Sequence, residues 1–278
     1  MKKTHFRFLL SVVFLFIFFF SLSAQVTVSP LTIFLDSKNR FATFLVINGS
    51  PMSQEVTLEF KFGYPSSDAD GKIYMQFADS QASLKYNMAG FLKAFPKKFI
   101  VRSGEQQVVR LTALAQDSLK EGSYWTRLIT KSTPQQASID TGASSGITTN
   151  IRFVLEQITT VMYRKGTVMT SITIDSIFAL TDTLGTHVVA KLHQGGNSPF
   201  LGKVAVKVWD PKGNQIFETM EYISAYFNSA KSFLVKDSKL PAGVYTTEWE
   251  ITSDRIDIPV EYILPATPIR VKTTFLLR

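Results

Sequence analysis

Short runs in which apolar and polar residues alternate, each followed by turn residues, constrain this chain more than any other feature. In Glu55–Phe62 every second residue is apolar, and the residues between them are charged or carry a hydroxyl group. Further strand-like runs occupy Arg40–Ile47, Gly202–Asp210 and Val244–Ile251. Side chains of a strand point alternately to opposite faces, so these runs indicate antiparallel sheets with one buried face. No long segment has the apolar spacing of a helix, and the sequence predicts an all-β protein.

The composition excludes several classes of protein. The chain has 278 residues, of which 45% are hydrophobic and 19% charged, too apolar a balance for a disordered protein. It has no cysteine, which excludes disulfides, cysteine-ligated metals and a cysteine nucleophile. The 30 Lys and Arg residues exceed the 22 Asp and Glu residues, but they are scattered along the chain. A nucleic-acid partner is therefore not expected, because it would call for a basic cluster or stripe.

The N-terminal segment has the pattern of an export signal. Basic residues up to Arg7 precede the apolar run Phe8–Phe20, and small residues follow as far as Ala24. The pattern predicts a signal peptide over residues 1–24, cleaved after Ala24, and a periplasmic protein. The alternative is an uncleaved anchor, although the run is shorter than the roughly 20 residues that a spanning helix needs. No later run is comparably apolar, so stable membrane insertion is not expected after cleavage.

Two domains are expected after the signal peptide. Strand patterns fill residues 25–165 and 166–278, and each block is large enough for one immunoglobulin-like β-sandwich. The first block also has room for an insertion near residues 63–93. Within the insertion, Gln76–Met88 fits either a short helix or an irregular excursion. The polar, turn-rich stretch Lys131–Gly146 predicts a long loop between two strands.

No motif for chemistry stands out. His187 and His193 have no acidic neighbours at ligand spacing, so a metal site is not expected. Asp68 and Asp70 near Gly71 resemble a fragment of a calcium loop, but the pattern stops there and favours a solvated turn. Nucleotide-binding and nucleophile motifs do not occur. We therefore expect a binding protein rather than an enzyme, with no cofactor and no small-molecule substrate.

Four segments of the first block resemble the N-terminal domain of the PapD-like periplasmic pilus chaperones. The most specific is Pro96–Leu111, with its Pro, hydrophobic pair, Gly, Gln and Val-Arg-Leu; the others are Arg40–Asn48, Glu121–Leu128 and Ile151–Arg164. The second block resembles only a generic immunoglobulin-like sandwich. The resemblance implies a periplasmic chaperone that stabilises subunits of a pilus or another surface structure by lending them a β-strand, without ATP. In the family, an outer-membrane usher is a further partner.

The strand that the resemblance implies is lent contains Ile151, Phe153 and Leu155. These three alternate and therefore project from one face, where each could contribute roughly 1.5–3 kcal/mol by burial in a partner's groove. The alternative is that they fill the core of their own domain, as residues of any sandwich strand would.

The resemblance also implies roles for four further positions. The family binds the subunit's C-terminal carboxylate with an Arg and a Lys, and the matching positions hold Pro30 and Thr160, neither of which is charged. Glu121 and Arg164 match a pair that in the family helps to set the angle between the domains, and we expect an ion pair there. The lost anchor bears on the usher-dependent pathway and not on the fold. The alternative function is a secreted adhesion or envelope-assembly module with the same fold.

Overall fold

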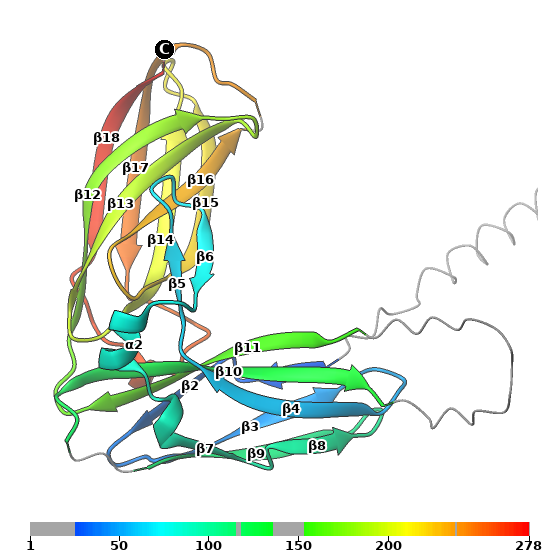
Figure 1. Ribbon diagram of the computed structural model, residues 1–278. Helices are drawn as coiled ribbons and strands as arrows, with labels where there is room; N and C mark the ends of the chain where they lie inside the picture. Colours follow the sequence, from blue (N-terminus) through cyan, green and yellow to red (C-terminus); the bar gives the residue numbers. More distant parts are fainter. Residues whose placement is uncertain (1–25, 115–117, 136–152, 237, 278) are drawn as a thin grey trace, which may run out of the picture.

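Two β-sandwiches meet as the arms of an L (Figure 1). The structure is a computed structural model that describes residues 26–114, 118–135, 153–236 and 238–277. The predicted signal peptide, residue Ile151 and most of the predicted loop Lys131–Gly146 lie outside the described residues. None of the helices in the described ranges is long and apolar enough to cross a membrane. The prediction of an all-β protein with two immunoglobulin-like sandwiches is confirmed.

The first sandwich consists of two sheets. One sheet has the order β1 (Val26–Ser29), β3 (Phe41–Asn48), β9 (Gln106–Ala113) and β7 (Leu92–Phe95). The other has the order β2 (Thr32–Asp36), β11 (Leu155–Lys165), β10 (Gly122–Pro134), β4 (Gln54–Lys61) and β8 (Lys98–Val101). The first two strands thus lie in different sheets, and the chain crosses between them at Pro30. All pairings in the first sandwich are antiparallel except that of β2 with β11.

The alternation seen in the sequence explains how this sandwich is packed. Phe44 and Val46 from one sheet meet Leu58 and Leu128 from the other, and all four are buried in one core. Asn48 closes β3 and is also buried; its side-chain amide donates to the carbonyl groups of Met52 and Val101. The Asn48 side chain therefore serves as a structural support for the turn.

The insertion forms a hairpin followed by a short helix. The hairpin strands are β5 (Tyr64–Ser67) and β6 (Ile73–Gln76), and α2 (Ser80–Tyr86) and a 3-10 turn, η1 (Ala89–Phe91), lead into β7. Asp79 begins α2 because its carboxylate accepts a hydrogen bond from the backbone N–H of Ala82, which lowers the Asp79 pKa. Of the two alternatives for Gln76–Met88, the structure contains the helix. In Figure 1 the hairpin rises out of the first sandwich and runs alongside the second.

The second sandwich also has two sheets. One has the order β12 (Thr170–Thr181), β13 (Thr186–Gly196) and β16 (Ser229–Lys236). The other has the order β15 (Gln215–Ala225), β14 (Phe200–Trp209), β17 (Gly243–Thr252) and β18 (Ile269–Leu277). The turn between β14 and β15 is held by Asp210, whose carboxylate accepts from the backbone N–H groups of Lys212 and Asn214. A 3-10 turn, η2 (Val260–Tyr262), lies in the connection between β17 and β18.

Two strand boundaries differ from those expected. Lys131–Pro134 was predicted to begin a loop but continues β10, because it pairs with both β4 and β11. In this part of β10, the ammonium group of Lys131 lies 2.9 Å from Glu59 and 3.4 Å from Glu156. Carboxylates on the two neighbouring strands therefore stabilise the end of β10, although its sequence is polar and resembles a loop. The second difference is the start of the following strand, which was expected at Ile151. In the structure β11 begins at Leu155, and Phe153 precedes it.

Trp249 lies at the centre of the second core and has no exposed surface. We expect Trp249→Ala to lower the free energy of unfolding by about 3–5 kcal/mol, because the removed ring leaves a cavity. Urea denaturation followed by circular dichroism measures the effect. Ile256→Ala is the control, since Ile256 is 94% exposed and its loss should change stability by less than about 0.5 kcal/mol. An unchanged unfolding midpoint for Trp249→Ala would contradict this account of the core.

Candidate partner-binding strand and interdomain corner

Strand β11 has one edge that is only half used. On one side it pairs with β10 over its whole length, from Leu155 opposite Ser132 to Lys165 opposite Gly122. On the other side it pairs with β2 only from Thr160 to Arg164. Within the described part of the chain, no strand therefore pairs with the edge of residues 155–159, although the Gln157 side chain donates a hydrogen bond to the Val26 carbonyl of β1. An unpaired edge of this kind presents backbone donors and acceptors to which another strand can add.

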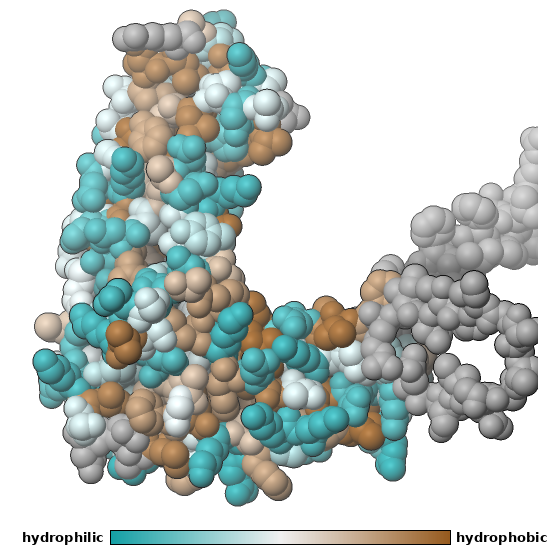
Figure 2. All heavy atoms as spheres, in the orientation of Figure 1, coloured by the Kyte–Doolittle hydropathy of each residue, from teal (hydrophilic) through white to brown (hydrophobic). Residues whose placement is uncertain are grey.

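Apolar side chains accompany this open edge. Phe153 is 72% exposed and Val154 52% exposed, and Ile158 is also exposed. Figure 2 shows apolar atoms on the upper surface of this arm, toward its free end. Phe153 therefore does not belong to the core of its own domain, which was the alternative that its sequence pattern left open. Leu155 is half-buried at the start of the strand.

The alternation of side chains along β11 explains why the first residues of its core-facing row are exposed to a partner. Val161 and Tyr163 face the core of the first sandwich and are buried. Leu155 has the same parity and so belongs to the same row, which continues past the point where the opposite sheet covers it. By the same alternation Phe153 extends the row further. Residues that would be core residues in the middle of the strand thus become available to a partner at its beginning.

The structure brings the two uncharged anchor positions together. The backbone N–H of Thr160 donates to the carbonyl oxygen of Leu31 at 2.9 Å, so Pro30 lies one residue from this contact. Pro30 is exposed, and Thr160 is half-buried. Neither can supply a charge, as the sequence indicated.

A charge does lie beside them, on the neighbouring strand. Arg127 of β10 is directly opposite Thr160 in the β10–β11 register, and its Nη1 donates to the Thr160 hydroxyl. Its Nε donates to the carbonyl oxygen of Gly63 at 2.9 Å, and its guanidinium carbon lies 5.0 Å from the centre of the Tyr226 ring. Arg127 is only 4% exposed, and its Nη2 has no hydrogen-bond partner.

Arg127 is therefore a buried cation without an anion. No ion pair between described residues includes it. A buried charge is costly unless it is paired, so this arrangement is suited to a negative group that arrives with a partner. The sequence reasoning missed Arg127. The available signal was a single Arg within the otherwise uncharged stretch Gly122–Thr130, in the strand next to a position where an anchor was expected.

The expected ion pair between Glu121 and Arg164 is not formed, and this prediction is wrong. Arg164 places its guanidinium 4.8 Å from the centre of the Phe34 ring, and burial lowers the Arg164 pKa to about 10. Phe34 in turn stacks on Tyr262 from the second sandwich, with ring centres 4.7 Å apart. The Glu121 side chain packs instead against Gly166. An aromatic ring thus takes the place of the carboxylate as the partner of Arg164 at the domain junction.

Aromatic side chains from both sandwiches fill the corner of the L. Trp125 is buried, and Tyr86 stacks on it with ring centres 4.6 Å apart. Tyr226 of the second sandwich meets the same indole ring edge-on at 4.9 Å. Closer to the linker, the hydroxyl of Ser123 donates to that of Ser198 at 2.7 Å. The corner is thus a packed interface and not an open hinge.

No protein-family model and no curated protein matches the sequence. Among solved structures, the YadV chaperone has a TM-score of 0.47 and 10% identity, over 90% of this chain and 100% of that chain. The Salmonella enterica SafB chaperone complex with the SafA pilin has a TM-score of 0.44 and 12% identity, over 89% and 95%. The E. coli chaperone DraB has a TM-score of 0.43 and 12% identity, over 89% and 95%. Identities this low leave the function of this chain open.

The stacking of Arg164 on Phe34 predicts unequal effects at the two residues that were expected to pair. Arg164→Ala should lower the free energy of unfolding by about 0.5–2 kcal/mol, since it removes a cation–π contact in a largely buried site. Glu121→Gln should change it by less than about 0.5 kcal/mol. Urea denaturation of the two variants and of the double variant measures both effects. If both single variants lose the same free energy of unfolding and the double variant loses less than their sum, the two residues interact directly. That result would contradict the stacking account and support the ion pair.

Proposed function

We propose that this protein is a periplasmic chaperone that binds subunits of a pilus or another surface structure by lending them a β-strand. The free edge of β11 is the observation that carries the proposal. Its apolar row and unpaired backbone are the two parts that an incomplete sandwich lacks. Pairing with the edge supplies backbone hydrogen bonds, and pockets for alternate side chains supply specificity. The mechanism needs no nucleotide, cofactor or catalytic group.

The energetics of Phe153 support lending. A side chain that is 72% exposed contributes little to folding its own domain, and its burial in a groove contributes roughly 1.5–3 kcal/mol to binding. Leu155 adds to this from the same row, and the alternation of the sequence predicts the same for Ile151, which lies outside the described residues. A partner that cannot complete its own sheet exposes a matching apolar groove. The complex therefore buries apolar surface of both proteins.

Arg127 and Thr160 provide a site for a carboxylate. The Thr160 hydroxyl accepts from Arg127, which leaves its own hydrogen free to donate to an anion. The charge of Arg127, held at low dielectric, then stabilises that anion through the hydroxyl. We infer that the C-terminal carboxylate of the partner binds here. On this view Arg127 takes over the part that two charged residues play in the family that the sequence resembles.

Co-expression tests the proposed function. Each β-rich surface protein encoded beside this gene is produced in a periplasm with and without the tagged mature chain. Expected is a subunit that aggregates alone but co-purifies in soluble form with this protein. If every such subunit is soluble alone and none co-purifies, the alternative of a secreted adhesion or envelope-assembly module is favoured instead.

Phe153→Asp should abolish capture of that subunit while leaving the free protein folded. A charge forced into an apolar groove must lose its water without gaining a partner, which costs several kcal/mol. The measurements are the melting temperature of the free variant and the yield of co-purified subunit. Phe41→Asp is the matched control, because Phe41 is 70% exposed but lies on β3 in the opposite sheet. A lowered melting temperature for Phe153→Asp, or equal loss of capture in both variants, contradicts strand lending.

Arg127→Met should weaken capture by about 10- to 100-fold, which corresponds to a charged hydrogen bond of about 1.5–3 kcal/mol. Thr160→Val should weaken it in the same direction, and Thr159→Val serves as the control, since Thr159 is buried on the other face of the strand. Titration of the purified subunit measures the affinities. A subunit whose C-terminal carboxylate has been amidated should bind wild type and Arg127→Met equally well. Undiminished binding of the unmodified subunit by folded Arg127→Met would exclude this anchor.

A further inference from the structure

The β5–β6 hairpin leaves the first sandwich and contacts the second. Its root is held in the corner, where Tyr64 is buried and meets Phe227 edge-on with ring centres 4.8 Å apart. The Tyr64 hydroxyl donates to Asp79 at 2.5 Å, and burial together with this bond raises the Tyr64 pKa. Gly63, at the start of the hairpin, accepts the hydrogen bond from Arg127 Nε. The root is thus bonded both to α2 and to the proposed anchor.

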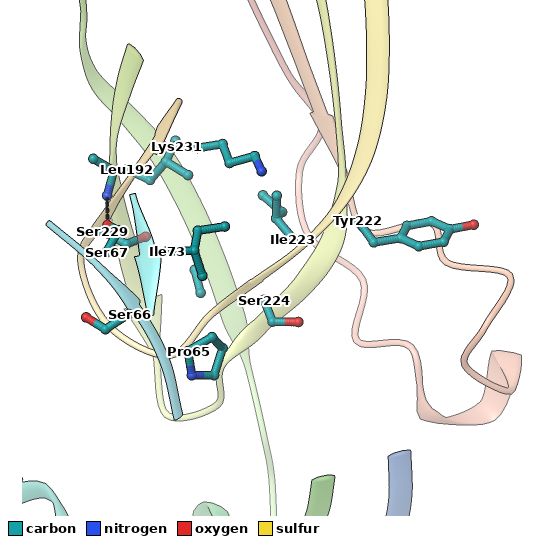
Figure 3. Close-up of a pocket in the computed structure, with 12 residues that line it drawn as sticks. Pro65, Ser66, Ser67, Ile73, Leu192, Tyr222, Ile223, Ser224, Ser229 and Lys231 are labelled. Atoms are coloured by element: carbon teal, nitrogen blue, oxygen red, sulfur yellow. Dashed lines mark hydrogen bonds between the residues drawn. The ribbon is translucent and has the colours of Figure 1, made fainter. Parts of the chain in front are cut away.

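The hairpin makes two contacts with β16 farther along. The Ser67 hydroxyl accepts a hydrogen bond from the backbone N–H of Ala230 at 2.6 Å, drawn as a dashed line in Figure 3. At the tip, Gly71 lies against the backbone of Ser232, so closely that a Cβ atom at position 71 would be 2.6 Å from the Ser232 nitrogen. The turn that presents Gly71 is held by Asp68, whose carboxylate accepts from the backbone N–H groups of Asp70 and Lys72.

Beside the Ser67 contact, part of the hairpin is separated from the second sandwich. A cavity open to solvent separates them, lined by Pro65 and Ile73 of the hairpin and by Leu192, Ile223 and Lys231 of the second sandwich (Figure 3). The hairpin is therefore joined to the second sandwich by contacts at Tyr64, Ser67 and Gly71, with an open cavity beside Ser67. A two-stranded hairpin is only marginally stable by itself, so these points also hold it in place.

We infer that the β5–β6 hairpin is a strut that fixes the angle between the two sandwiches. On the function proposed above, which this inference deepens, the strut also sets the shape of the corner that receives the partner's chain end. Three observations support it. The root is anchored in the first sandwich, and the tip is fitted to β16 without room for a side chain. Between them, the Ser67 hydroxyl accepts a hydrogen bond from the backbone N–H of Ala230 in the second sandwich. The Glu121–Arg164 pair that was expected to set the angle is absent, which leaves this task to other contacts.

The free protein tests the strut without any partner. Because the chain has no cysteine, Lys98→Cys and Lys212→Cys introduce unique sites for spin labels, one on each sandwich and both exposed. Pulsed electron paramagnetic resonance then gives the distribution of distances between the arms. Gly71→Ala should shift and broaden this distribution, since the added methyl group pushes the tip away from Ser232.

Gly104→Ala is the matched control. Gly104 also has a positive φ, 73° against 82° for Gly71, but nothing lies within 4 Å of a Cβ atom placed there. Both variants therefore carry similar backbone strain, and only Gly71→Ala has the clash. The control should keep the wild-type distance distribution.

A second pair of variants tests the strut if Gly71→Ala folds poorly. Ser67→Ala removes the acceptor for the Ala230 N–H, and Ser66→Ala, its neighbour on the hairpin, removes a hydroxyl without that bond. A broadened distribution for Ser67→Ala but not for Ser66→Ala supports the strut. Wild-type distributions in both folded Gly71→Ala and Ser67→Ala overturn it. Neither outcome depends on whether the protein captures a subunit, so the strut and the proposed function fail separately.

Discussion

The pairing of β10 with β11 is the interaction on which the rest of the molecule depends. Its ladder of eleven residue pairs runs from the open end of the first sandwich to the domain junction. At one end it holds the apolar row beside an unpaired edge. In the middle it sets Arg127 opposite Thr160, and near the junction it brings Arg164 to Phe34. A shift of one residue in this register would turn every one of these side chains to the other face.

Much of the fold could be predicted because strand alternation is a local property. Runs such as Glu55–Phe62 carry their buried face in their own order of residues, and the hairpin at Asp210 has its turn residues in place. The start of the predicted loop at Lys131 was wrong because strand pairing is not local. The charges that keep Lys131 in a strand lie on two other segments, at Glu59 and Glu156.

The candidate site was less accessible to sequence reasoning for the same reason. Phe153 could be named from its alternation, but whether it is core or exposed depends on where the opposite sheet ends. Arg127 becomes unusual only when Gly63, Thr160 and Tyr226 surround it, and these come from three separate segments. The partner expected for Arg164 was a carboxylate by resemblance. The chain instead supplies Phe34, a ring whose face attracts a cation as well.

The short reach of β2 has a consequence for any chain that adds to β11. β2 occupies the edge of β11 from Thr160 onward. A strand that is added at the open end can therefore pair with β11 only as far as Thr160, and β2 limits the length of that pairing. A chain can stop in a sheet without turning away only if it ends. The stop lies beside Thr160 and Arg127, so a terminal carboxylate would meet a cation at the point where its strand runs out. A strand that ends there with its C-terminus runs parallel to β11, in the same direction as β2.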